Sequence, residues 1–122
     1  MPKTGEIPSI ESREKALLIA GLAADKKAGG VVILQMEGLT SFTDYFVICS
    51  GESTTQVRTI AEHIKEGLGA RGLKPIGVEG LSNRMWVLID CGDVIVHVFE
   101  ADTRAFYELE KLWLDAPRLN WP

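Results

Sequence analysis

The chain has 122 residues, of which 46% are apolar and 25% are charged. This length suits one domain and excludes two of ordinary size, and the composition excludes a disordered or collagen-like chain. The longest apolar run, residues 16–24, is well under the roughly 20 residues that a membrane helix needs. The first ten residues lack the pattern of a secretory signal, so we expect a cytoplasmic protein.

The net charge of −4 comes from 13 Lys and Arg against 17 Asp and Glu, and it is unevenly distributed. Residues 1–78 carry nine acids and nine bases, whereas residues 79–115 carry eight acids and three bases. Nucleic-acid binding through phosphates requires clustered Lys and Arg, so the last third has the wrong sign for it. A basic protein surface is the better-matched partner, and an acidic solvated surface without a partner stays open on charge alone.

The first half of the chain is expected to contain a helix followed by two strands. Small and apolar residues recur at helical spacing from Pro8 and Ser9 up to the glycine pair at 29–30, which ends the pattern. Runs rich in β-branched and aromatic residues at 31–36 and 44–50, with a turn between them, predict two buried strands.

A second helix is expected after the second strand. Ser53 is followed three residues later by Gln56, the spacing of a capping box that satisfies free backbone donors at a helix start. The apolar stripe of this helix ends at Arg71. Because a strand follows at 75–79, the segment forms a β-α-β unit, and we predict parallel pairing between its two strands.

The last third predicts a hairpin and a helix. Apolar strands at 85–91 and 94–99 flank a Gly-Asp turn, which is typical of antiparallel pairing. Asp102 or Thr103 can cap a final helix with an apolar face of Phe106, Leu109, Leu112 and Trp113. The order α-β-β-α-β-β-β-α predicts a single α/β domain, with a mixed sheet of about five strands and helices mainly on one face.

Two candidate catalytic sites have simpler structural explanations. The turn at 50–53 can bind an anion through helix-start amides, but it lacks a phosphate-binding glycine motif and carries Glu52, so a capping turn is favoured. Asp90 and Asp93 are the best carboxylate pair for metal-dependent phosphoryl or nucleotidyl transfer. They flank a tight turn, however, instead of alternating on one face of a strand.

The cysteines and histidines are too scattered to predict a zinc site. Cys49 and Cys91 lie inside apolar runs, so buried, free thiols are expected. A nucleophile formed by Cys49 with His63 or His97 is disfavoured, because the thiol lies in a predicted buried strand. His97 alternates with apolar residues, which favours a histidine packed on a sheet face.

An aromatic and acidic surface is the remaining candidate. Trp86, Leu88 and Asp90 alternate along the strand 85–91 and therefore share one side of it. If the helices cover only the other side, this set forms an exposed apolar patch rimmed by acids, which is typical of a protein interface with an aromatic anchor. Trp86 as ordinary core is the alternative.

Longer motifs resemble a known family. The runs TSFTDYFVICSGESTTQVRTIAEHI and IDCGDVIVHVFEADTRAFYELEKLW, with the GVEG segment and the Trp86 strand between them, resemble the ribosomal silencing factor family, also called Iojap-like. The resemblance covers residues 12–115, which we take as the domain, between an N-terminal extension (1–11) and a C-terminal tail (116–122). It implies a fold similar to that of nucleotidyltransferases without their catalytic carboxylates.

The resemblance also implies a partner. It implies a translational repressor that binds large-subunit ribosomal protein fourteen, blocks joining of the small subunit and lowers translation when nutrients are scarce. No catalytic residue, cofactor or metal is implied. For the partner surface we predict Trp86 as the aromatic anchor, with Glu79, Asp90, Asp93, Glu100 and Tyr107 around it. A nucleotidyltransferase-like, nucleotide-binding enzyme is the alternative, and a homodimer is compatible with the repressor.

Overall fold

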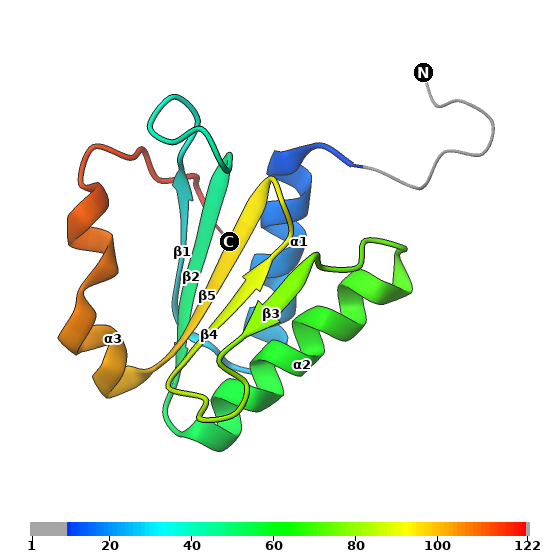
Figure 1. Ribbon diagram of the computed structural model, residues 1–122, viewed down its shortest axis with the longest axis vertical. Helices are drawn as coiled ribbons and strands as arrows, with labels where there is room; N and C mark the ends of the chain where they lie inside the picture. Colours follow the sequence, from blue (N-terminus) through cyan, green and yellow to red (C-terminus); the bar gives the residue numbers. More distant parts are fainter. Residues whose placement is uncertain (1–9, 122) are drawn as a thin grey trace.

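Two long helices, α1 (Ser12–Asp25) and α2 (Thr54–Ala70), pack side by side against one face of a five-stranded sheet (Figure 1). The structure is a computed structural model that describes residues 10–121, so the predicted helix start at Pro8 and Ser9 lies outside the described residues. Within that range, no helix is both long and apolar enough to cross a membrane. The predicted order of helices and strands is confirmed.

The strands are β1 (Gly29–Gln35), β2 (Tyr45–Gly51), β3 (Gly77–Glu79), β4 (Trp86–Asp90) and β5 (Val94–Glu100). The first helix ends three residues earlier than its apolar pattern, because Lys27 adopts a φ of 61° that a helix does not allow. The second helix begins as predicted. The hydroxyl of Ser53 accepts a hydrogen bond from the Gln56 backbone N–H at 3.1 Å, and the Gln56 side chain accepts one from the backbone N–H of Glu52 at 2.7 Å.

The sheet has the order β1-β2-β5-β4-β3, and its one parallel pair joins β2 to β5. The prediction that strand 44–50 pairs with strand 75–79 is therefore wrong, because β5 and β4 lie between them. The burial of the strands gives the physical reason. β5 is buried along most of its length and takes the central place, whereas β3 has two exposed residues and one partly buried residue and lies at an edge.

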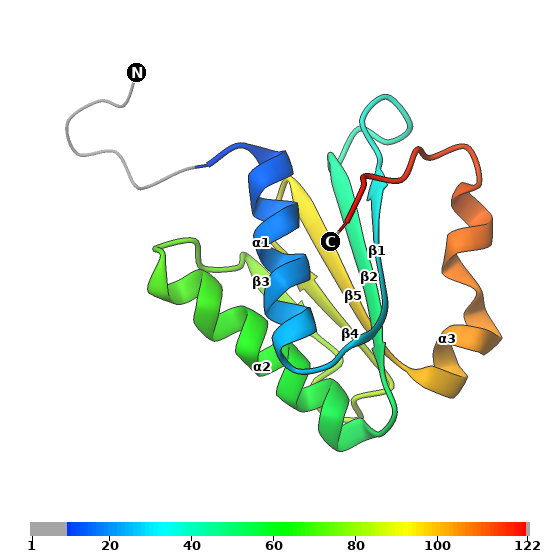
Figure 2. The same ribbon diagram turned by 180° about the vertical axis from the view of Figure 1, so that it is seen from behind.

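Both faces of the sheet carry a core. On the side of α1 and α2, the helices bury the alternating valines of β5 and the inward residues of β2 and β4. The opposite side carries a smaller cluster around Phe46, Ile48 and Phe99. This second cluster is covered only in part, by the segment that follows β5. The two long helices both lie on the other face of the sheet, as expected (Figure 2).

The predicted last helix is interrupted. α3 (Ala101–Tyr107) begins directly after β5, and its cap is Glu100 instead of Asp102 or Thr103. Glu108 then adopts a φ of 48°, which ends the helix, and a 3-10 helix, η1 (Leu109–Trp113), follows. The break turns Leu109 and Trp113 toward the sheet.

The predicted apolar face of the last helix is consequently divided between core and surface. A straight helix would place all four of its apolar side chains on the sheet, but Phe106 is 80% exposed and Leu112 is 72% exposed.

The C-terminal tail crosses the outer edge of β1, and it is drawn in red in Figure 2. The Gln35 backbone N–H donates to the carbonyl of Pro117 at 2.8 Å, and the Leu119 N–H donates to the carbonyl of Ile33 at 2.9 Å. Leu119 and Trp121 pack against the core on the α1 side. The tail thus covers backbone groups that an edge strand would otherwise expose.

Candidate functional site

Trp86 begins β4 on the sheet face opposite α1 and α2, where it is half-buried. Its indole stacks on Phe99 of β5 with 4.8 Å between ring centroids, and it lies 5.1 Å from the ring of Tyr107 in α3. The indole N–H donates a hydrogen bond to Nδ1 of His97 at 3.1 Å. Trp86 is therefore anchored in the smaller core on one side and open on the other, which combines the two alternatives that the sequence left.

Trp86 lies at the centre of a row of rings that we call the aromatic band. Successive rings of the band have centroids 4.7 to 6.4 Å apart, across β2, β5, β4 and α3. Phe42, Tyr107 and Phe106 are exposed, whereas Phe46 and His97 are buried and Trp86 is half-buried. In order, the members of the band are Phe42, Phe46, His97, Trp86, Tyr107 and Phe106.

Two hollows open beside Trp86. The larger has a volume of about 820 Å³ and lies between the β3–β4 loop and α3, with Met85, Phe106 and Tyr107 as its apolar wall. Glu100 and Asp102 also line it. The smaller, about 320 Å³, is lined by Glu79, Gly80, Trp86 and Leu88. An aromatic ring between two acid-lined hollows is suited to contact with an apolar and basic protein surface.

Glu100 contributes a stable negative charge to the larger hollow. Its carboxylate accepts hydrogen bonds from the backbone N–H groups of Asp102 and Thr103, both at 3.1 Å. The hydrogen bond from the Asp102 N–H, joined by those from Thr103, holds the pKa of Glu100 below its ordinary value. The carboxylate is therefore ionised at neutral pH while it caps α3.

The six predicted partner residues fall into two groups. Trp86, Glu79, Glu100 and Tyr107 line the two hollows. Asp90 and Asp93 lie toward the opposite end of the β4–β5 hairpin, because Trp86 pairs with Phe99 whereas Asp90 pairs with Ile95. At roughly 3.3 Å per strand residue, the ends of β4 are about 13 Å apart.

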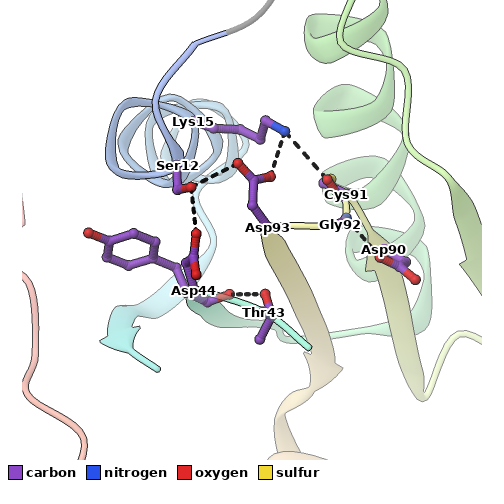
Figure 3. A network of polar contacts seen from close by, with 9 residues as sticks. Ser12, Lys15, Thr43, Asp44, Asp90, Cys91, Gly92 and Asp93 are labelled. Atoms are coloured by element: carbon purple, nitrogen blue, oxygen red, sulfur yellow. Dashed lines mark hydrogen bonds and ion pairs between the residues drawn. The ribbon is translucent and has the colours of Figure 1, made fainter. Parts of the chain in front are cut away.

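The carboxylates of Asp90 and Asp93 point away from each other (Figure 3). Asp93 forms an ion pair with Lys15 at 2.6 Å and accepts a hydrogen bond from the hydroxyl of Ser12 at 2.9 Å. Asp90 accepts one from the Gly92 backbone N–H at 2.8 Å, within the turn. Across residues 10–121, no group of three or more His, Cys, Asp or Glu side chains is placed to hold a metal ion.

The ion pair between Lys15 and Asp93 ties α1 to the hairpin and yields a stability prediction. Both side chains are largely buried, with exposed fractions of 14% and 29%. We expect Lys15→Met to lower the free energy of unfolding by about 1 to 2 kcal/mol, since it leaves a carboxylate without its cation. Chemical denaturation measures this, and the exposed pair of Arg58 and Glu62 is the control, where Arg58→Ala should change it by about 0.5 kcal/mol or less. Equal effects at the two sites would contradict the prediction.

The two serines of the turn at 50–53 have their side chains engaged within the protein. Ser53 caps α2, and the hydroxyl of Ser50 lies 3.3 Å from the Gly29 carbonyl and 3.3 Å from the guanidinium of Arg104. The capping turn favoured from the sequence is confirmed by these contacts.

The thiols and histidines do not meet. Cys49 is fully buried, and burial raises its pKa to about 12; burial raises the pKa of Cys91 to about 11. Because β2 pairs Ile48 with His97, the thiol of Cys49 and the imidazole of His97 lie on opposite faces of the sheet. His63 instead lies 3.1 Å from Asp25, between α2 and α1.

Local sequence patterns missed one residue that supports this surface and one that belongs to it. Arg104 holds α3 in place by donating to the carbonyls of Gly29 and Gly30 at 3.2 and 2.8 Å, and it forms two 3.1 Å contacts with Glu110. Its backbone partners are more than 70 residues away, so no local signal marks them. Phe42 was also missed, because its loop has no periodicity.

The fold and this surface first define a class: a small α/β protein whose most developed surface is suited to binding another protein. A family model described as "Ribosomal silencing factor during starvation" matches residues 9–122, and the chain therefore belongs to the ribosomal silencing factor family. The resemblance stated from the sequence motifs is confirmed. The family is named for silencing ribosomes, which is a regulatory role.

Individual proteins similar to this chain support the same family. The chain is 46% identical over 106 residues to the ribosomal silencing factor RsfS of Bacillus subtilis, covering 85% of this chain and 90% of the relative. A crystal structure of a protein from Chromobacterium violaceum superposes with a TM-score of 0.83 at 33% identity, covering 85% and 87% of the two chains. A mouse relative named "Mitochondrial assembly of ribosomal large subunit protein 1" is 30% identical over 79% of this chain and 43% of its own length.

Proposed function

We propose that this chain binds the large ribosomal subunit in the cytoplasm through its protein fourteen, and that it blocks joining of the small subunit under nutrient limitation. The observation that carries the proposal is Trp86, which is half-buried between two acid-lined hollows in a member of the silencing factor family. The name of the mouse relative, which refers to assembly of the large ribosomal subunit, supports that subunit as the partner.

Charge favours a protein contact over an RNA contact on the ribosome. Glu79, Glu100 and Asp102 line the hollows beside the indole, in the part of the chain that carries the acidic excess. These carboxylates repel RNA phosphates and attract a basic protein surface. Because the pairing is electrostatic at its rim, association should slow as salt concentration rises.

The mechanism that we propose is occupancy without catalysis. A protein that covers the joining face of the large subunit excludes the small subunit sterically, and the blocked fraction follows from its concentration relative to the dissociation constant. The contacts of Asp90, Asp93 and Ser53 support this mechanism, since the groups needed for nucleotidyl transfer are engaged in holding the fold.

The test is a subunit-joining experiment. Large subunits are mixed with saturating protein before small subunits are added, and the particles are separated on a density gradient. We expect the joined-ribosome peak to fall and the protein to migrate with the large subunit. If small subunits are saturated with the protein first and excess protein is then removed, joining should be normal. An unchanged joined-ribosome peak at saturation would overturn the proposal.

A further inference from the structure

We propose that His97 is the positioning residue for the Trp86 anchor: its neutral imidazole accepts the indole N–H and holds the ring in one orientation toward the two hollows. The inference deepens the proposed function and rests on it, since it assigns how the anchor is prepared for its partner. Trp86 Nε1 lies 3.1 Å from His97 Nδ1, across neighbouring strands β4 and β5.

Stacking alone does not fix the indole. The ring lies on Phe99 at an interplanar angle of 30°, which defines the plane of the indole. An indole flipped about its side-chain bond could still stack there, with its six-membered ring displaced. The hydrogen bond from Nε1 selects one of these orientations, because only that one places the N–H against an acceptor.

His97 itself is held rigidly and kept neutral. Only 5% of the residue is exposed, and its ring lies 4.7 Å from that of Phe46 in an edge-on arrangement. Burial lowers the pKa of His97 to about 4, so the imidazole carries one proton at neutral pH. Since Nδ1 accepts the indole N–H, that proton is assigned to Nε2.

The remaining nitrogen argues against a purely structural role. Nε2 of His97 is buried and has no hydrogen-bond partner among residues 10–121. A buried donor without a partner destabilises a fold, so leucine or phenylalanine would fill this place at lower cost if packing were the only requirement. The bond that His97 accepts from Trp86 explains why a polar residue occupies the site.

The consequence for binding is preorganisation. When the acceptor is removed, the indole can adopt more than one orientation, and a partner must select the productive one at the expense of affinity. We expect His97→Leu to weaken binding to large subunits by about three- to tenfold, the range of one net hydrogen bond. His97→Asn, which keeps an acceptor close to the position of Nδ1, should stay within about twofold of the natural protein.

The experiment combines a spectroscopic signature with a double-mutant cycle. In ¹⁵N-labelled protein, Trp86→Phe identifies the indole resonance of Trp86 among those of the three tryptophans. We expect slow hydrogen exchange at this N–H in the natural protein and in His97→Asn, and fast exchange in His97→Leu. In titrations with large subunits, adding His97→Leu to Trp86→Phe should cause no further loss.

Several results would overturn the inference. Fast exchange at the Trp86 N–H in the natural protein, or the same affinity loss in His97→Asn as in His97→Leu, would show that His97 acts by packing alone. If the affinity losses of His97→Leu and Trp86→Phe add up in the double variant, this would also show that His97 does not act through Trp86. Melting temperatures check that each variant folds, and His97→Phe replaces His97→Leu if the latter does not. If the natural protein fails to bind large subunits, the proposed function fails, and the exchange measurements still decide the role of His97.

Discussion

Replacing Trp86 with alanine is expected to weaken binding to the large ribosomal subunit at least about 30-fold, which corresponds to about 2 kcal/mol. The substitution removes the ring that lies between the two hollows and leaves Phe99 and Tyr107 without their central neighbour. A partner would then meet a water-filled hollow instead of an apolar anchor. Titration of the labelled protein with purified large subunits measures the change.

Two further variants separate binding from folding in this prediction. Leu114 is 80% exposed and lies outside both hollows, so Leu114→Ala removes an apolar surface side chain away from the candidate site and should leave affinity unchanged. Trp86→Phe keeps a ring that can stack on Phe99 and should lose less affinity than Trp86→Ala. Near-natural affinity of a folded Trp86→Ala protein would place the interface on another surface.

The largest effect on stability is expected from Gly80→Ala. Gly80 precedes β4 with a φ of 90°, a backbone conformation that residues with a side chain rarely adopt. A Cβ atom there would lie 2.1 Å from the carbonyl oxygen of Trp86, which is backbone and cannot rotate away. The left-handed conformation and the steric overlap together should lower the free energy of unfolding by about 2 to 5 kcal/mol.

A second glycine supplies the matched control for this substitution. Gly21 lies inside α1, and a Cβ atom added there meets nothing within 4 Å. Gly21→Ala should therefore raise the free energy of unfolding by up to about 1 kcal/mol, because alanine favours the helix. Urea denaturation of the two variants measures both changes. A Gly80→Ala protein as stable as the natural chain would show that the loop before β4 tolerates a side chain.

Gly80→Ala also connects stability to the candidate surface. The residue lines both hollows, and its clash would displace the backbone of Trp86. We expect reduced affinity for large subunits from any Gly80→Ala protein that still folds. Titration at a temperature at which the variant is fully folded measures this loss separately from the loss of stability. The position of the anchor thus depends on a residue that makes no side-chain contact of its own.

Much of the local structure was predictable because it depends on neighbours in the chain. The Ser53 and Gln56 pair predicted the start of α2 from a hydrogen-bond pattern that spans three residues. The alternation of Trp86, Leu88 and Asp90 predicted that they share a face of the sheet, since side chains on a strand alternate. The acidic excess after residue 78 is likewise visible in the sequence alone.

The candidate surface was only partly predictable. Trp86 and the acid Glu100 were found from alternation and charge, and the structure places both beside the larger hollow. Asp90 and Asp93, which were predicted together with them, lie toward the other end of the hairpin, because a shared hairpin does not imply a shared end. The contact between Trp86 and His97 depends on strand register, which no local pattern specifies.

The sequence by itself thus determined the order of helices and strands, the family, the acidic last third and the set of residues that share one side of β4 with Trp86. Only the tertiary structure decided that β2 pairs with β5, that Glu108 breaks the last helix, and that Trp86 is half-buried against His97. The physical reason is the separation along the chain between the residues that interact. Capping, periodicity and turn preferences involve residues a few positions apart, whereas strand order and the coverage of the second sheet face depend on burial shared by segments far apart in the chain.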